Sequence, residues 1–267
     1  MNAEPKTWHH GLVAQYWAEF NTDGPEIAYF QRQIERFGQP ALDAGCGTGR
    51  LLLPWLVAGL DVDGCDISAD MLSLCRAKAE RLRVSPRLYQ QAMHEMQLPR
   101  LYQTIVACGA FEMVGTRDHA RRALRRMYDQ IKPGGFLLLD HHPPYVNSKQ
   151  WQYWLKERRQ ELPQPWPQGD GERRVASDGS EYQLCARLIS VDPLEQRVIM
   201  QMRAALWRNG ERVAREEHEL HLNQYFLHEL RLMLEVSGFE LKALTANYTD
   251  ETATAQDEVI VLLAQKQ

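Results

Sequence analysis

The 267-residue sequence lacks the features that mark several large classes of protein. No apolar run approaches the roughly 20 residues that a membrane-spanning helix needs. The first residues, MNAEPKTWHHG, do not have the apolar core of a signal peptide. The five cysteines are odd in number and form no C-x-x-C pair, so neither a disulfide framework nor a zinc site is indicated. These absences predict a cytoplasmic protein with reduced thiols, no membrane partner and no bound metal.

The sequence also has little net charge of either sign. Its formal net charge is -4, so it offers no general attraction for nucleic acid, whose binders usually carry a basic face. The arginines between residues 121 and 126 form the one local basic cluster, and apolar residues alternate with them at helical spacing. That pattern favours a solvated helix face over a phosphate site. We therefore expect no nucleic-acid partner.

Residues 40–141 alternate short apolar runs with longer amphipathic ones, as βαβ units do. After the first strand, Pro54 should bend or shorten a helix. Ser68 can cap the next helix, whose predicted buried stripe ends at Leu82. KPGG at 132–135 predicts a turn. The expected strands are 40–44, 61–67, 87–91, 104–109 and 136–142, with a third helix near 118–131.

Residues 143–222 differ in texture from the rest of the chain. A segment rich in proline and tryptophan precedes three strand-like runs, and Asn209-Gly210 between the last two is a strong hairpin signal. Trp151, Trp154 and Leu155 have the spacing of a short amphipathic helix, which could also act as a lid. The runs cover 182–191, 197–207 and 211–222.

The final residues return to the α/β pattern, with a helix around 224–236 and strands at 239–247 and 258–265. We predict an α/β fold with a doubly wound, mostly parallel, seven-stranded Rossmann-like sheet. Its last strand is antiparallel, and a small antiparallel β-meander is inserted. The predicted division is a cofactor-binding domain of residues 1–142 and 223–267 and an inserted lid and sheet of residues 143–222.

The stretch ALDAGCGTGR at 41–50 places three glycines between a strand and a helix, where backbone amides can approach a ligand closely. Asp66 ends the second strand, where a carboxylate can accept both hydroxyls of a ribose. The dinucleotide fingerprint wants a further glycine or alanine where this chain has Arg50, which we expect to crowd the helix–sheet contact and a pyrophosphate. The pattern favours a nucleoside ligand without pyrophosphate.

These motifs resemble those of class I S-adenosylmethionine-dependent methyltransferases. LDAGCGTGR, DGCDIS and KPGG carry the resemblance, and residues 211–240 look like the late section of the amino-sugar and glycine N-methyltransferase subgroup. The resemblance implies S-adenosyl-L-methionine as cofactor. Ala92 and Gln103 stand where the family often has aspartates, so a cofactor-binding protein without transferase activity is an alternative. The implied cofactor-binding residues are Tyr16, Asp43, Gly45, Cys46, Gly47, Asp66, Ile67, Met71, Ala92, Met93, His94 and Cys108.

Methyl transfer from a sulfonium is an in-line displacement, so the protein supplies mainly position and exclusion of water. The acceptor should lie at the carboxyl ends of the fourth and fifth strands. Glu112, His141 and His142 are the candidate catalytic residues there, with Phe111 and Tyr145 nearby. Adjacent residues of a strand face opposite ways, so at most one of the two histidines should face the substrate; each could instead be structural.

We expect a small-molecule methyl acceptor. HPPY at 142–145 resembles the N-P-P-Y motif of enzymes that methylate amide or nucleobase nitrogens, but it follows the fifth strand instead of the fourth, and we interpret it as unrelated. The inserted residues would cover the substrate, form a homodimer surface, or both. An NAD(P)-dependent oxidoreductase is the alternative enzyme, against which Arg50 argues.

Overall fold

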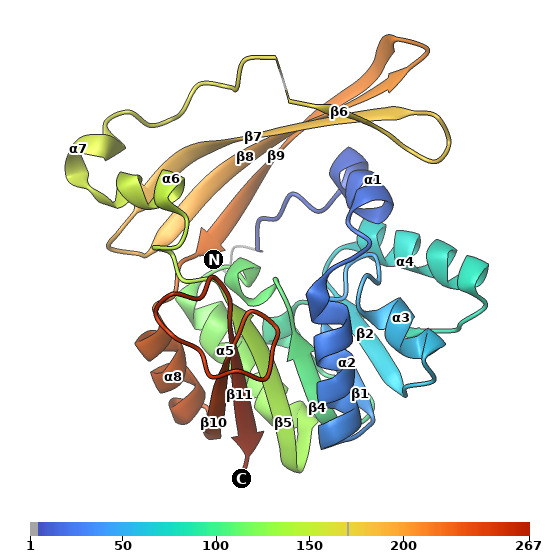
Figure 1. Ribbon diagram of the computed structural model, residues 1–267, viewed down its shortest axis with the longest axis vertical. Helices are drawn as coiled ribbons and strands as arrows, with labels where there is room; N and C mark the ends of the chain where they lie inside the picture. The colour runs from blue at the N-terminus through green and yellow to red at the C-terminus, as the bar shows by residue number, and fades with distance from the viewer. Residues whose placement is uncertain (1–4, 170) are drawn as a thin grey trace.

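The computed structural model describes residues 5–169 and 171–267, which form two β-sheets with flanking helices (Figure 1). The larger sheet has seven strands in the order β10-β11-β5-β4-β1-β2-β3. β11 is antiparallel to both of its neighbours, β5 and β10, whereas the other pairs are parallel. The predicted fold class is confirmed. The strands are β1 (Ala41–Ala44), β2 (Val62–Asp66), β3 (Arg87–Gln90), β4 (Tyr102–Ala107), β5 (Ile131–His141), β10 (Phe239–Ala246) and β11 (Ile260–Lys266).

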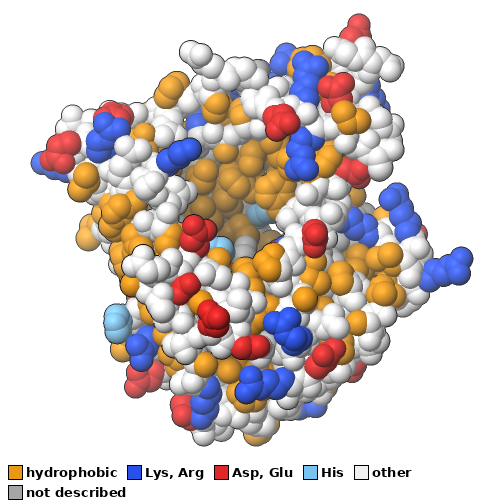
Figure 2. Space-filling view, in the orientation of Figure 1, with side chains coloured by type: hydrophobic (Ala, Val, Ile, Leu, Met, Phe, Trp, Pro, Cys, Tyr) orange, Lys and Arg blue, Asp and Glu red, His pale blue; other side chains and the backbone are white. Residues whose placement is uncertain are grey.

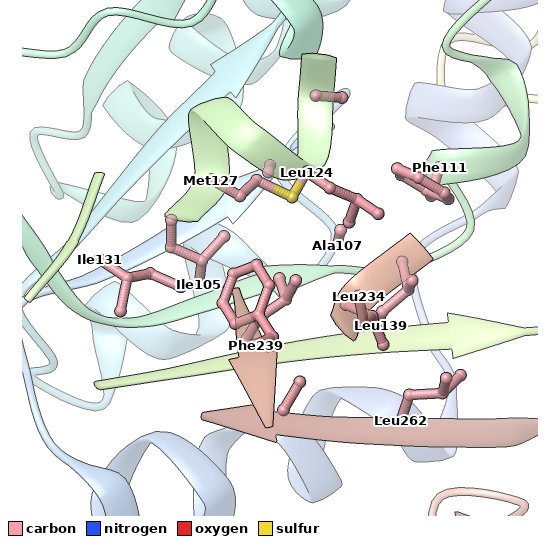
Figure 3. Close-up of a cluster of buried hydrophobic side chains, with 14 of the residues drawn as sticks. Ile105, Ala107, Phe111, Leu124, Met127, Ile131, Leu139, Leu234, Phe239 and Leu262 are labelled. Atoms are coloured by element: carbon pink, nitrogen blue, oxygen red, sulfur yellow. The ribbon is translucent and has the colours of Figure 1, made fainter. Parts of the chain in front are cut away.

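Helices cover both faces of this sheet (Figure 1). α2 (Pro25–Phe37), α3 (Leu52–Val57) and α4 (Ala69–Leu82) pack on one face, while α5 (Arg117–Gln130) and α8 (Leu227–Val236) pack on the other. The second face holds the larger apolar cluster, drawn in Figure 3. Because the sheet is buried on both faces, its central strands are almost continuously apolar.

Local sequence signals explain most of these boundaries. The Ser68 side chain accepts a hydrogen bond from the Met71 amide at 3.2 Å and so caps α4 as predicted. α3 is only 6 residues long and contains Pro54, in agreement with the expected shortening. Leu82 is 50% exposed, so the predicted buried stripe of α4 ends at Ala79 instead. The helix rotates Leu82 away from the sheet in its last turn before Arg83 adopts a left-handed conformation.

KPGG is not a separate turn before the fifth strand. β5 already begins at Ile131, which pairs with Tyr102, and the register then shifts so that Thr104 pairs with Phe136. The residues between them bulge out of the ladder, and Gly134 has φ +76°, a conformation that glycine adopts without strain. KPGG therefore has the backbone conformation of a turn, but it forms a bulge within β5 instead of preceding the strand.

The second sheet is an antiparallel meander in the order β6-β7-β8-β9. It lies across the carboxyl ends of the parallel strands (Figure 1). The hairpin signal is confirmed, because Asn209 and Gly210 both have positive φ between β8 and β9. β6 was not predicted. The strands are β6 (Arg173–Val175), β7 (Glu181–Asp192), β8 (Arg197–Arg208) and β9 (Glu211–Asn223).

Short helical turns lead into this sheet, and helix α1 (Gly11–Phe20) packs against it. The predicted amphipathic helix at residues 151–155 is interrupted. α6 (Ser148–Trp151) is followed by the 3-10 turn η3 (Gln152–Trp154), and Leu155, 60% exposed, adopts an extended conformation before α7 (Lys156–Arg159). Within the described residues, no helix is long and apolar enough to cross a membrane.

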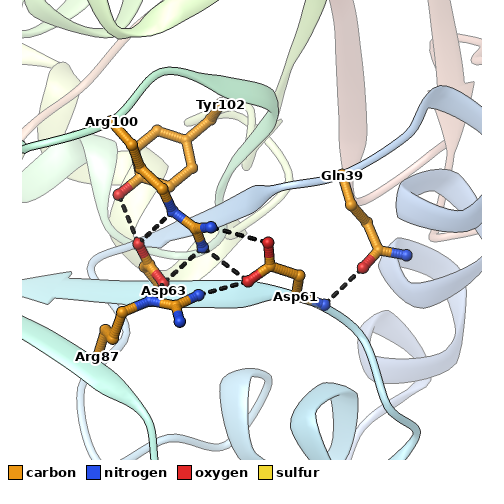
Figure 4. A network of polar contacts seen from close by, with 6 residues as sticks. All are labelled: Gln39, Asp61, Asp63, Arg87, Arg100 and Tyr102. Carbon is orange, nitrogen blue, oxygen red and sulfur yellow. Dashed lines mark hydrogen bonds and ion pairs between the residues drawn. The ribbon is translucent and has the colours of Figure 1, made fainter.

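The amino ends of β2, β3 and β4 are joined by a polar network (Figure 4). The Asp63 carboxylate, fully buried, accepts hydrogen bonds from Arg87 Nε at 2.6 Å, Arg100 Nε at 2.8 Å and the Tyr102 hydroxyl at 2.8 Å. Arg100 also bonds Asp61, which is half exposed. The network lies at the end of the sheet opposite the inserted strands, so we assign it a structural role.

Candidate active site

The carboxyl ends of β1, β2 and β4 open into a pocket. This is the edge where ligands bind in doubly wound sheets, since the loops there diverge. All of the predicted cofactor-binding residues except Tyr16 line it. They are Asp43, Gly45, Cys46, Gly47, Asp66, Ile67, Met71, Ala92, Met93, His94 and Cys108.

The glycine loop keeps the pocket floor free of side chains. Gly45 has φ +90°, and a Cβ there would meet the Ala110 Cβ at 2.4 Å and the Met93 Cε at 3.0 Å. Gly49 has φ +84°, and a Cβ there would meet Cys75 Sγ and Leu53 Cγ, both at 2.7 Å. Gly45 thus lets the loop pass under a ligand, and Gly49 lets α3 and α4 pack closely.

Arg50 does not occupy the helix–sheet contact, contrary to our expectation. Its guanidinium forms an ion pair with Glu26 of α2, and the close packing that the fingerprint requires is made one residue earlier by Gly49. Arg50 still lines the pocket, whereas Gln103 does not. Gln103 lies at the amino end of β4, where its backbone amide donates to the Pro40 carbonyl. Its replacement of a family aspartate therefore does not touch the cofactor-binding residues.

Asp66 holds the loop as well as facing the pocket. Its Oδ2 accepts from the Gly47 amide at 2.8 Å and its Oδ1 accepts from the Ser68 amide at 2.8 Å. Burial raises the pKa of Asp66, and these amides oppose the shift. A carboxylate held at both oxygens has a fixed orientation, and its remaining lone pairs can accept ligand hydroxyls.

Asp43 is an acid buried under the same loop. Its side chain is 2% exposed, and its Oδ2 has no hydrogen-bond partner among the described residues. Burial, followed by the charge of Asp66, raises the pKa of Asp43 to about 8. A buried orphan acceptor in a pocket wall indicates that a cationic or hydrogen-donating ligand completes the site.

The far wall of the pocket carries Ala92, Met93 and His94, which begin the turn after β3. The His94 ring stacks on His119 of α5 with centroids 3.9 Å apart and planes within 10°. Burial, with His119 as the next cause, lowers the pKa of His94. The wall therefore presents a neutral aromatic ring and a thioether, which suit a flat heterocycle.

The predicted catalytic residues lie beside this pocket. Glu112, on the 3-10 turn η2 (Phe111–Met113), has its Oε1 4.0 Å from His141 Nδ1, and Met113 of the same turn lines the pocket. The structure thus brings Glu112 and His141 together. His142 faces away, with its side chain 48% exposed and its Nε2 3.9 Å from Asp140 Oδ2.

Burial controls the charges of the Glu112–His141 pair. It raises the pKa of Glu112 to about 8, with the Asp140 charge as the second cause. It lowers the pKa of His141 to about 4, with His142 as the second cause. Neither ring nitrogen of His141 has a hydrogen-bond partner in the part of the chain that the structure describes. The pair can therefore accept or donate one proton.

Of the two other strand-end candidates, neither lines the pocket in the described structure. Phe111 is buried against Tyr225 in the large apolar cluster, with ring centroids 5.4 Å apart. Tyr145 is 43% exposed and contacts Trp151. Their positions indicate packing and surface roles respectively.

Sequence reasoning missed the partner network of Asp140. This buried carboxylate accepts from the Gly109 amide at 2.7 Å, the Tyr248 hydroxyl at 2.8 Å and Cys108 Sγ at 3.2 Å. Cys108 and Gly109 line the pocket, so Asp140 fixes the loop after β4. Tyr248 follows β10, more than 100 residues later in the chain, and no local pattern links it to this site.

The N-terminal segment forms part of the pocket wall, but through other residues than the predicted Tyr16. Thr7, His9 and Trp17 line the pocket, and the His9 carbonyl accepts from Ser68 Oγ at 2.6 Å. Tyr16 instead contacts Phe20, with ring centroids 4.7 Å apart. Helix α1 thus places Trp17, the residue after Tyr16, at the pocket.

Comparison with known proteins identifies the class of enzyme to which this chain belongs. Residues 41–135 match the family described as "Methyltransferase domain". A provisionally named methyltransferase of Geobacillus sp. (strain WCH70) is 25% identical over 247 residues, which cover 90% of this chain and 91% of that protein. The chain is a class I S-adenosylmethionine-dependent methyltransferase. This assignment replaces the oxidoreductase alternative.

Solved structures show that the methyltransferase fold extends over nearly the whole chain. An S-adenosylmethionine-dependent methyltransferase from Clostridium acetobutylicum ATCC 824 has a TM-score of 0.72 at 18% identity and covers 94% of this chain and 96% of its own. CalS10, an amino pentose methyltransferase of Micromonospora echinaspora with the cofactor bound, has a TM-score of 0.63 at 19% identity, with 95% of each chain covered.

The residues of this methyltransferase fit its cofactor, S-adenosyl-L-methionine. Asp66 suits the ribose hydroxyls, and the orphan oxygen of Asp43 suits a cationic group, of which this cofactor carries a sulfonium and an ammonium. Ala92 has no side-chain acceptor, so an adenine at this wall would be recognised by backbone groups and by Met93 and His94.

Proposed function

We propose that this methyltransferase acts on a small-molecule acceptor that binds between the seven-stranded body and the inserted sheet. The position of Glu112 supports this most directly. Its turn reaches the cofactor pocket through Met113, while its carboxyl group lies against buried His141 at the strand ends. Residues 143–222 would serve as substrate cover, and the homodimer through their sheet stays a prediction.

The cofactor supplies an activated methyl group on a sulfonium. The chain contributes position and proton transfer. Glu112, with a side chain 24% exposed, is the group that touches the acceptor and removes its proton, whereas His141 is buried behind it and positions the carboxyl group. Because the pKa of Glu112 is about 8, its ionised, proton-accepting form increases as the pH rises toward that value.

The first test measures release of S-adenosylhomocysteine with a panel of small phenols and amines. We expect turnover that rises with pH and levels off above about 8, where Glu112 is ionised. Glu112→Gln should lower kcat by about a hundredfold, remove that inflection and leave the Kd for S-adenosyl-L-methionine within about twofold. His142→Gln, which changes the exposed neighbour, is the matched control and should retain both rate and pH profile.

A rate that stays at background with every small molecule but increases with tRNA or a protein mixture would overturn the proposed acceptor class. An unchanged pH profile in Glu112→Gln would remove this carboxyl group from the reaction.

A further inference from the structure

The face of the inserted sheet that packs against α1, called the inner face here, is apolar along its central strands. Every second residue from 182 to 188 on β7 and from 198 to 206 on β8 is apolar, and paired positions such as Met200 and Leu188 share this face. The opposite face carries charged side chains such as Arg203 and Glu217, 3.0 Å apart. The alternation buries one face and solvates the other.

Other parts of the chain pack on the two ends of the inner face and leave its middle open. At one end Leu12 and Val13 of α1 pack on it, and at the other end Tyr153 does. Met200 and Leu222 contact both apolar clusters and remain only partly buried. Figure 2 shows the result, a hollow lined largely by hydrophobic side chains between the sheet and the body.

This hollow is continuous with the cofactor pocket. Met113 and Trp17 line that pocket and also pack against the apolar cluster of the inner face. A molecule that lies on the middle of the sheet therefore reaches the pocket and the Glu112 turn without crossing solvent. Exposed apolar patches in such a position usually bind a ligand.

The middle of the inner face, as the structure describes it, carries no cationic side chain that would bind a phosphate group. At the described inner-face positions between 182 and 188 of β7 and between 198 and 206 of β8 no charged residue occurs, and Arg208 lies beyond them at the end of β8, where its Nε donates to Ser180 Oγ. On β9, Glu216 and His218 contact each other. Glu216 Oε2 lies 3.0 Å from His218 Nε2 and accepts from the Leu12 amide at 2.9 Å. A desolvated phosphate without a cation would be strongly disfavoured there.

We infer that the acceptor is a lipophilic molecule without phosphate groups, which lays its apolar body on Met200 and Leu222 and directs one polar group toward Glu112. This inference rests on the proposed function and narrows its substrate class. The inferred acceptor differs from an amino pentose, the acceptor named for CalS10, because a sugar buries little apolar surface.

The test uses 4-alkylphenols from butyl to octyl, titrated calorimetrically into protein saturated with S-adenosylhomocysteine. We expect the Kd to tighten about two- to fourfold with each added methylene until the hollow is filled. A thymidine diphosphate sugar, the phosphate-bearing counterpart, should not bind measurably. Binding of S-adenosyl-L-methionine alone is measured first, so that failure of the proposed function is recognised separately.

Two adjacent residues of β8 give a matched pair of variants. Met200→Gln, on the inner face, should weaken binding of the octyl compound about fivefold or more, whereas Ile199→Gln, on the opposite face, should change it by less than about twofold. Both variants should keep the Kd for S-adenosyl-L-methionine, which shows that they fold. No dependence on chain length, or preferred binding of the nucleotide sugar, would overturn the inference. A dimer in sedimentation that Met200→Gln dissociates would assign the face to a second copy and overturn it too.

Discussion

The glycine loop presents mostly backbone groups to the pocket. Individual acidic side chains therefore supply the polar groups that can recognise a ligand there. Asp66 both orients the loop through the Gly47 amide and presents acceptors to the pocket. Asp43 contributes a buried acid with a free oxygen. Both acids are therefore candidates for ligand binding, and substitution can test each one.

Asp66→Ala should weaken binding of S-adenosyl-L-methionine by about a hundredfold or more. The change removes hydrogen bonds between ribose hydroxyls and a charged group, each worth roughly 1.5–3 kcal/mol. Calorimetric titration measures the effect, and thermal unfolding verifies the fold. Asp118→Ala, an exposed acid on α5, serves as the control. An affinity unchanged by Asp66→Ala would refute the ribose role.

At the scale of elements, the polar network of Figure 4 ties β2, β3 and β4 together at their amino ends. Tyr102 is fully buried, and its hydroxyl donates to the Asp63 carboxylate at 2.8 Å. Tyr102→Phe would leave this charged acceptor with one donor fewer, and we expect unfolding to become about 1.5–3 kcal/mol easier. Urea titration measures the change.

Tyr89→Phe on β3 is the matched control for that change. The Tyr89 ring is partly buried near the same network, and its hydroxyl makes no hydrogen bond within the described residues. We expect its free energy of unfolding to change by less than about 0.5 kcal/mol. Equal losses in the two variants would show that the bond from the Tyr102 hydroxyl to Asp63 adds no stability at this edge.

The elements themselves could largely be predicted from sequence, because their signals are local. Alternating apolar runs, the Ser68 cap and the Asn209-Gly210 hairpin each act within a few residues. KPGG shows the limit of such signals, since its glycine conformation is correct but the strand pairing of Ile131 with Tyr102 is set by tertiary contacts.

The site could be predicted only where residues that are close in the structure come from consecutive elements of the sequence. The glycine loop and Asp66 lie in consecutive βα units, so their proximity follows from a parallel sheet. Tyr248 meets Asp140, and His9 meets Ser68, across long sequence separations that no periodicity encodes. Arg50 illustrates the same point, because its ion pair with Glu26 depends on where α2 packs, which the sequence does not show.

For the whole molecule, buried acids and buried histidines oppose each other in the dependence of stability on pH. His9 and His141 have pKa values lowered from 6.5 to about 4 in the folded chain. As the pH falls below 6.5, these histidines take up protons more readily in the unfolded chain, so they lower the free energy of unfolding. Asp43 and Glu112 have pKa values raised to about 8. Their contribution is fully present below about pH 4 and is lost as the pH rises through 8.

Between pH 4.5 and 6.5 the two trends offset each other, because the unfolded chain binds extra protons at the histidines and the folded chain binds them at the acids. Between pH 6.5 and 8 only the acids still titrate. We therefore expect the free energy of unfolding of the ligand-free protein to fall over this interval by roughly 1–3 kcal/mol. Thermal unfolding in a series of buffers measures it.

Asp43→Asn and Glu112→Gln should each flatten that fall, since each removes one acid that is protonated only in the folded chain. S-adenosyl-L-methionine should flatten it as well, but through Asp43 alone, because its positive charge stabilises the ionised carboxylate and lowers the pKa. Addition of the cofactor to Asp43→Asn should then leave the remaining slope unchanged. If the cofactor flattens the slope equally in Asp43→Asn, another acid must meet its charge, and Asp66, whose pKa burial also raises, is the next to substitute.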